Sequence, residues 1–129
     1  MQDRPEYRNV RREVSAFLTE RIRVAELAGI RPENILLDPG FGFGKSLEHN
    51  LQLLACLEQM HILGHPLLVG VSRKSMLGHI TGRDVNERLP ASVAAATIAA
   101  MKGASIIRVH DVRETVDAVR VVAAVKEAG

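Results

Sequence analysis

Three short runs of apolar residues alternate with longer segments of helical periodicity. The runs cover residues 35–37, 66–71 and 106–109. Such short and uniformly apolar runs are typical of parallel strands that are buried on both faces. We therefore predict three strands in one parallel sheet.

The segments between these runs have apolar residues spaced for helices. We predict helices over about residues 10–28, 46–60, 90–102 and 113–127. The resulting order, α-β-α-β-α-β-α, is typical of the α/β class, and residues 1–129 are predicted to form a single domain. Three strands leave two sheet edges bare, and the first helix has no strand before it. We therefore expect this domain to be part of a larger sheet.

Composition and charge exclude several classes of protein. The chain has 17 Lys and Arg against 15 Asp and Glu, so its net charge of +2 does not favour a nucleic-acid partner. Cys56 is the single cysteine, which excludes an intrachain disulfide. There is no apolar run long enough to span a membrane, and the charged N-terminus does not resemble a signal peptide. We expect a cytoplasmic protein with no membrane or nucleic-acid partner.

Charged and hydroxyl residues follow each predicted strand. Asp38 follows the first strand, residues 72–75 (Ser-Arg-Lys-Ser) follow the second, and Arg108, His110 and Asp111 come at the end of the third. The carboxyl ends of parallel strands meet on one side of a sheet, where ligands gather in α/β folds. The three clusters therefore predict one site.

The first cluster has two explanations that the residues leave open. Asp38 precedes Pro-Gly and is as well explained by a turn as by a ligand. The glycine-rich loop at residues 40–45 is not a Walker phosphate loop, because Pro39 stands where the first glycine is required. Phe43 on this loop would suit a planar ligand, whereas Phe41 is expected in the core.

The second and third clusters favour an anion or an electron-rich heterocycle. Arg73 and Lys74 at a helix start would oppose the helix dipole unless a bound anion compensated them. Arg108 and His110 alternate along a strand, and a guanidinium beside an imidazole suits phosphate or carboxylate recognition. The alternative is an ion pair of these two residues with Asp38 or Asp111. The polar stretch at residues 81–88, including Arg88, is expected to be a solvated loop.

Three motifs taken together resemble the dihydropteroate synthase family. They are LLDPGFGFGK at residues 36–45, LLVGVSRKS at residues 67–75 and IIRVHDV at residues 106–112. They are similar to the signatures of that family's sixth, seventh and eighth strands. The resemblance implies the C-terminal part of a pterin-binding TIM (β/α)8 barrel, with three of its parallel strands. Met1-Gln2 would then be the remainder of a segment after the fifth strand.

The resemblance also implies a reaction and a set of roles. The family condenses 6-hydroxymethyl-7,8-dihydropterin diphosphate with p-aminobenzoate to give dihydropteroate and pyrophosphate, and sulfonamides bind its p-aminobenzoate pocket. Lys74, Arg108 and His110 would be catalytic. The substrate-binding residues would be Asp38, Phe43, Gly70, Lys74, Ser75, Arg108 and His110.

Within this set, Asp38 and Lys74 would bind the pterin. Arg108 and His110 would hold the diphosphate, and Phe43 and Ser75 would border the p-aminobenzoate pocket. Mg²⁺ would bind through the diphosphate, with its protein ligand in the first half of the barrel, so no residue of this chain is assigned as a metal ligand. A homodimer is expected.

Three other functions remain open from the sequence. The first is the pterin-binding domain of a corrinoid-linked methyltransferase, and the second is a non-catalytic half-barrel that self-associates. A sugar-phosphate barrel enzyme is the third. Because the first half of the barrel is absent, we expect the chain alone to be inactive.

Overall fold

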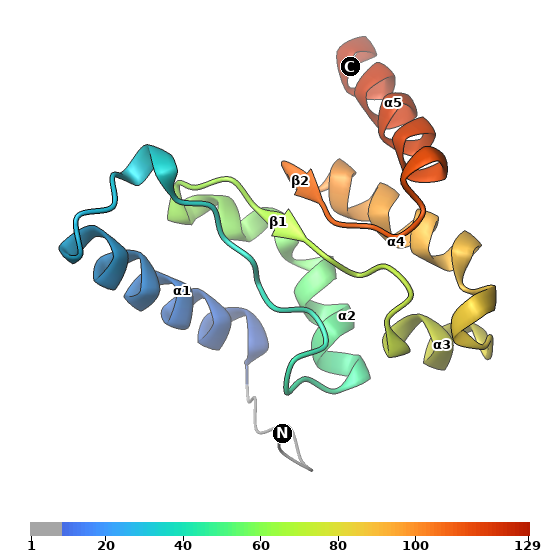
Figure 1. Cartoon of the computed structure of the whole chain (residues 1–129), viewed down its shortest axis with the longest axis horizontal. Coiled ribbons are helices and arrows are strands. Elements are labelled where there is room, and N and C mark those ends of the chain that lie inside the picture. Colours follow the sequence, from blue (N-terminus) through green and yellow to red (C-terminus); the bar gives the residue numbers. More distant parts are fainter. Residues whose placement is uncertain (1–8) are drawn as a thin grey trace.

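The computed structural model describes residues 9–129; Met1-Gln2 lies outside them. In this part of the chain, helices dominate and two short strands lie between them (Figure 1). The α-helices and strands are α1 (Val10–Leu27), α2 (Leu47–Ala55), β1 (Leu68–Val69), α3 (Ser75–Thr81), α4 (Leu89–Met101), β2 (Ile106–Ile107) and α5 (Val112–Ala128). Three 3-10 segments complete the described order: η1 (Pro32–Asn34), η2 (Leu57–Leu63) and η3 (Val85–Glu87).

The predicted parallel pairing is confirmed between the second and third apolar runs. β1 pairs with β2 in parallel, with Leu68 opposite Ile106 and Val69 opposite Ile107. On the other side, Leu37 forms an isolated parallel bridge with Leu67. The three apolar runs therefore lie side by side and point in the same direction.

The prediction of a full strand at residues 35–37 was wrong. Only Leu37 is paired, through Leu37 N to Pro66 O at 2.8 Å and Leu68 N to Leu37 O at 2.7 Å. The physical reason is the shortness of the run, because η1 ends just before it and Pro39, which has no N–H, follows Asp38. A single bridge still fixes where Asp38 lies relative to β1.

Two of the helix predictions also needed correction. The helix expected over residues 46–60 ends at Ala55 and is followed by η2, which stops at the left-handed Gly64. A helix, α3, is missing from the predicted order, although the sequence offers a helix start at residues 72–75 that its two cations disfavour. It is short and ends at Gly82 with φ 72°, and it buries only Met76 and Leu77, so its apolar period was too weak to detect.

The core is aliphatic, as the scarcity of aromatic residues requires. α1 begins at Asn9, whose side chain accepts a hydrogen bond from Arg12 N, and it buries Val10, Val14 and Leu18. Phe41 is 1% exposed in the same cluster, as predicted. The other fully buried members include Leu53, Leu57, Met60, Leu67, Val69 and Val71. Through Phe41, the glycine-rich loop is anchored in this cluster.

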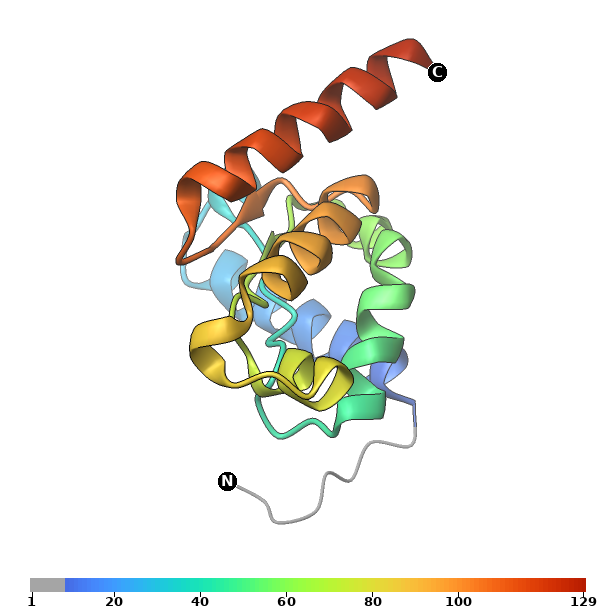
Figure 2. The same cartoon turned by 90° about the vertical axis from the view of Figure 1, so that its right-hand side faces the viewer.

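α4 and α5 lie on the β2 side of the molecule. The alanines of α4 (Ala95, Ala96, Ala99 and Ala100) are buried, and α5 crosses beyond them with its C-terminal end projecting away (Figure 2). α5 buries Thr115 and Val122 but leaves several valines exposed among the described residues. These are Val112, Val116, Val119, Val121 and Val125.

Candidate active site at the strand ends

The pairing register of β1 and β2 continues beyond both strands as side-chain contacts. Leu68 and Ile106 are paired at a separation of 38 residues. The same separation joins Ser72 to His110 and Arg73 to Asp111. The second and third polar clusters are therefore held against each other, as the sequence predicted from the parallel arrangement.

Ser72 is the buried member of the first pair. It is 7% exposed, and its Oγ lies 2.8 Å from His110 Nδ1. The same oxygen accepts a hydrogen bond from His110 N at 3.2 Å. Sequence reasoning did not single out Ser72, because a serine at a strand end gives no signal of its own until its partner 38 residues away is known.

Arg73 and Asp111 form the second pair. Arg73 Nη2 lies 2.8 Å from Asp111 Oδ1, and the backbone of Arg73 is left-handed with φ 56°. Arg73 N donates to Ser92 Oγ at 2.9 Å, while Arg73 O accepts from Arg88 Nη1 at 2.9 Å. The expectation that Arg88 lies in a solvated loop was wrong, because its side chain is half-buried against this turn.

The alternative explanation of Arg108 and His110, an ion pair with Asp38 or Asp111, is not observed among the described residues. Asp111 pairs with Arg73, and none of the ion pairs within the described residues includes Arg108, His110 or Asp38. The exposed His110 and Arg108 are thus held without a carboxylate partner in this part of the chain.

Asp38 forms the turn that the sequence allowed. Its Oδ1 accepts a hydrogen bond from Gly40 N at 2.8 Å. The side chain is exposed, and its charge acts on both Lys45 and Lys74, opposing the lowering of the pKa of each ammonium. Asp38 is thus a turn former and also a negative charge near Lys45 and Lys74.

The glycine-rich loop places one phenylalanine inside and one outside. Gly40 and Gly42 adopt φ 76° and 90°, a left-handed backbone that favours glycine. Phe41 between them is buried, whereas Phe43 is 71% exposed. Gly42 N donates to Asn50 Oδ1 at 2.9 Å, which ties the loop to α2.

Lys74 lies at the centre of the site. Its Nζ donates to Phe41 O at 2.5 Å and lies 5.4 Å from the centre of the Phe43 ring. Burial lowers the pKa of Lys74, and the nearby positive charge of Arg108 lowers it further, against the opposing effect of Asp38. Asp38 and Arg108 are therefore both close enough to act on the charge of Lys74.

Lys45 is a second ammonium that sequence reasoning left without a role. Its Nζ donates to Gly40 O at 2.7 Å and to Phe43 O at 3.2 Å. Burial and then the charge of Lys74 lower the pKa of Lys45. Lys45 closes the loop that carries Phe43.

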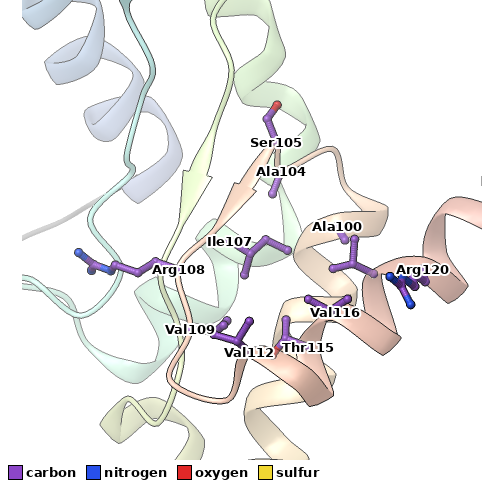
Figure 3. A pocket seen from close by; sticks show the side chains of 11 residues that line it. Ala100, Ala104, Ser105, Ile107, Arg108, Val109, Val112, Thr115, Val116 and Arg120 are labelled. Carbon is purple, nitrogen blue, oxygen red and sulfur yellow. The ribbon is translucent and has the colours of Figure 1, made fainter.

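Arg108 lies across Gly70 on the inner side of β2. A Cβ on Gly70 would come within 2.9 Å of Arg108 Nη2, so the missing side chain makes room for the guanidinium. Figure 3 shows the Arg108 side chain on the opposite side of the strand from Ile107 and Val109. The apolar residues face a cavity of about 490 Å³ between β2 and α5, and the charge points away from it.

A second cavity of about 460 Å³ adjoins the glycine-rich loop. It is lined by Asp38, Phe43 and Lys45 from the loop side and by α1 residues including Glu13 and Phe17. Ser75 is exposed at the first turn of α3, beside Lys74. The loop thus offers a hollow with charged and aromatic walls.

The described residues supply no metal site by themselves. Within residues 9–129, no group of three or more His, Cys, Asp or Glu side chains is placed to hold a metal ion. The same residues include no helix that is long and apolar enough to cross a membrane. The charged groups of the site are instead dominated by cations.

Comparison with known proteins identifies the family. The sequence profile described as "Pterin binding enzyme" matches residues 1–110. The dihydropteroate synthase of Escherichia coli (strain K12) is 56% identical over 124 residues, which are 96% of this chain and 44% of that enzyme. That of Haemophilus influenzae is 49% identical over 121 residues, again covering 44% of its length. The chain thus spans less than half the length of these curated relatives.

Comparison with solved structures leads to the same family. The Yersinia pestis dihydropteroate synthase with a sulfonamide drug has a TM-score of 0.97 at 49% identity, over 99% of this chain and 47% of that one. The Xanthomonas albilineans dihydropteroate synthase in complex with 7,8-dihydropteroate has a TM-score of 0.92 at 52% identity, over 95% and 47%. These neighbours support the α/β-barrel fragment that the three motifs implied. The chain belongs to the pterin-binding enzyme family, and its resemblance to the dihydropteroate synthases is confirmed.

Proposed function

We propose that this chain provides the C-terminal part of a dihydropteroate synthase active site. The complete enzyme would be a transferase that joins 6-hydroxymethyl-7,8-dihydropterin diphosphate to p-aminobenzoate and releases pyrophosphate. One observation carries the proposal: Asp38 and Arg108, which follow the two segments paired on either side of β1, both lie within electrostatic reach of Lys74.

The pterin would bind between Asp38 and Lys74. An ionised carboxylate only accepts hydrogen bonds, so Asp38 matches the N–H groups of an aminopyrimidinone edge. Lys74 supplies donors for the ring oxygen and nitrogen on the other side. Gly70 has no side chain, so the Arg108 guanidinium can lie against its backbone at this site.

The diphosphate would bind to Arg108 and His110. Negative charge accumulates on a departing pyrophosphate, and donors fixed in advance stabilise it where it develops. Lys74, Arg108 and His110 would thus act in catalysis by holding the leaving group and the ring, while p-aminobenzoate attacks the methylene carbon. Magnesium, which would stabilise the same charge, would bind through the diphosphate with its protein ligand outside this chain.

The p-aminobenzoate would lie against Phe43, bordered by Ser75. The Phe43 ring is mostly exposed beside the Lys74 ammonium, so it offers apolar surface against which a planar aromatic ligand could pack. A relative from Xanthomonas albilineans has been solved with 4-aminobenzoic acid, and one from Yersinia pestis with a sulfonamide. We propose the same ligand classes for the complete protein.

The remaining proposals concern the domain, the oligomeric state and the cellular location of the complete protein. Residues 1–129 would form one continuous part of a single barrel domain in a cytoplasmic homodimer. The exposed valines of α5 offer apolar surface both for the rest of the barrel and for a partner subunit. The corrinoid-linked methyltransferase is not favoured, because the named relatives are dihydropteroate synthases over 94% or more of this chain.

A replacement experiment tests the function. The chain is purified alone, and it is also placed in the Escherichia coli dihydropteroate synthase in exchange for the 124 matched residues. We expect no dihydropteroate from the chain alone and turnover from the chimera. Turnover should be lost in Lys74→Ala and Arg108→Ala, and kept in Arg83→Ala, which changes an exposed arginine away from the site.

Two outcomes would contradict the proposal. A folded chimera that binds neither pterin diphosphate nor p-aminobenzoate would refute the synthase function. Dihydropteroate formation by the isolated chain would refute the expectation that it is incomplete.

A further inference from the structure

We infer that Ser72 positions His110 and fixes the tautomer of its neutral ring, with the proton on Nε2. This inference rests on the proposed function, because it assigns the form in which His110 meets the diphosphate. Ser72 itself would touch no substrate. It is a positioning residue that acts through the imidazole.

The argument begins with the hydrogen-bonding capacity of a hydroxyl. Ser72 Oγ has one proton to donate and two lone pairs with which to accept. One lone pair takes His110 N at 3.2 Å. The other hydrogen-bond contact of this oxygen within residues 9–129 is with His110 Nδ1 at 2.8 Å.

The burial of Ser72 decides the direction of that contact. If Nδ1 carried a proton and donated, the hydroxyl proton of Ser72 would have no acceptor among residues 9–129. Ser72 is only 7% exposed, and a buried donor without a partner costs free energy. The arrangement that satisfies both groups is donation from Ser72 Oγ to an unprotonated Nδ1.

The tautomer follows from this direction. A neutral imidazole carries one proton, so when Nδ1 accepts, the proton is on Nε2. Nε2 lies on the side of the ring away from the buried hydroxyl, and His110 is an exposed residue. The ring therefore presents a fixed N–H donor at the strand ends without needing a positive charge.

Gly70 and Ser72 together explain the spacing of the anion-binding pair. Gly70 makes room for Arg108, and two residues later Ser72 bonds His110, so alternate residues after β1 support alternate residues after β2. Arg108 supplies charge and His110 supplies a directed donor. A diphosphate offers both a charge and several acceptor oxygens to such a pair.

The decisive measurement is the protonation of the two ring nitrogens. The chain of residues 1–129 and the chimera are labelled with ¹⁵N-histidine, and the His110 signals are assigned by their loss in His110→Gln. Long-range ¹H–¹⁵N correlation is then recorded with the ring neutral. We expect protonated Nε2 and unprotonated Nδ1. Ser72→Ala should give a mixture of tautomers, whereas Ser105→Ala, at the other end of β2 and exposed, should change nothing.

Kinetics in the chimera provide the second readout. Ser72→Ala is expected to raise KM for the pterin diphosphate about three- to tenfold, the worth of one hydrogen bond, and to leave KM for p-aminobenzoate unchanged. Ser72→Thr keeps the hydroxyl and should keep both the Nε2–H tautomer and a KM near wild type, even if Ser72→Ala fails to fold.

The inference and the proposed function fail in different ways. A protonated Nδ1 in the neutral wild-type ring, or a Ser72→Ala variant with unchanged tautomer and KM, would overturn the inference. A chimera that is inactive with the expected tautomer intact would count against the synthase function instead.

Discussion

The guanidinium of Arg108 packs against Gly70, so close that a side chain on Gly70 would crowd it. A Cβ on Gly70 would be 2.9 Å from Arg108 Nη2, 3.1 Å from Nε and 3.4 Å from Cζ. The missing side chain after β1 thus leaves room for a cation after β2. This relationship leads to the first prediction.

Gly70→Ala is expected to displace Arg108 without unfolding the chain. Arg108 is exposed and its end can move, so the change should weaken anion binding more than it affects stability. In the chimera we expect a several-fold rise in KM for the pterin diphosphate and a melting temperature close to wild type. If the effect acts through Arg108, Gly70→Ala should raise this KM no further when Arg108→Ala is already present.

Substitutions of the two phenylalanines in the glycine-rich loop should have different effects, one on stability and the other on binding. Phe41→Ala removes a ring that is 1% exposed and should cost about 3 to 5 kcal/mol of unfolding free energy. Phe43→Ala removes a ring that is 71% exposed and should stay within about 0.5 kcal/mol.

The same Phe43→Ala change should weaken binding of p-aminobenzoate and sulfonamides to the chimera. Urea unfolding and calorimetric titration check the two effects. Equal affinities of wild type and Phe43→Ala for p-aminobenzoate would remove Phe43 from the proposed pocket.

Lys74 should make stability depend on alkaline pH. Its pKa is lowered in the folded state, first by burial and then by Arg108, from an ordinary value of 10.5. Between the folded and the ordinary pKa, the unfolded chain binds more protons than the folded one, so this contribution to stability rises with pH. Below the folded pKa both forms are charged, and the contribution is constant.

Lys74→Met tests this sign. The stability of wild type minus that of Lys74→Met, from urea unfolding at a series of pH values, should increase as pH approaches 10.5. Lys102→Met, which alters an ammonium that pairs with Glu58 far from the site, serves as the control. A stability difference that is constant or falls with pH would show that folding does not lower the pKa of Lys74.

Arg73 should tolerate glycine better than alanine. Both changes remove the ion pair with Asp111, worth about 1 kcal/mol at a partly exposed site. Only glycine relieves the left-handed backbone at φ 56°, a gain of roughly 1 kcal/mol. Thermal unfolding should therefore rank wild type and Arg73→Gly above Arg73→Ala, and the reverse order of the two variants would contradict a strained turn.

The sequence by itself determined the class of the fold and the positions of the polar clusters. The apolar runs predicted parallel strands within residues 66–71 and 106–109, and helical periodicity predicted α1, α4 and α5 within a few residues. It also placed Phe41 in the core. These features depend on local periodicity and burial, which a single sequence expresses directly.

Only the tertiary structure decided how the clusters meet. The separation of 38 residues joins Gly70 to Arg108, Ser72 to His110 and Arg73 to Asp111, and no local pattern encodes it. The wrong prediction of a strand at residues 35–37 has the same origin, because a strand forms only where a neighbouring segment hydrogen-bonds to its backbone. Pairing partners are set by packing across the whole sheet, so they became known only once the chain was folded.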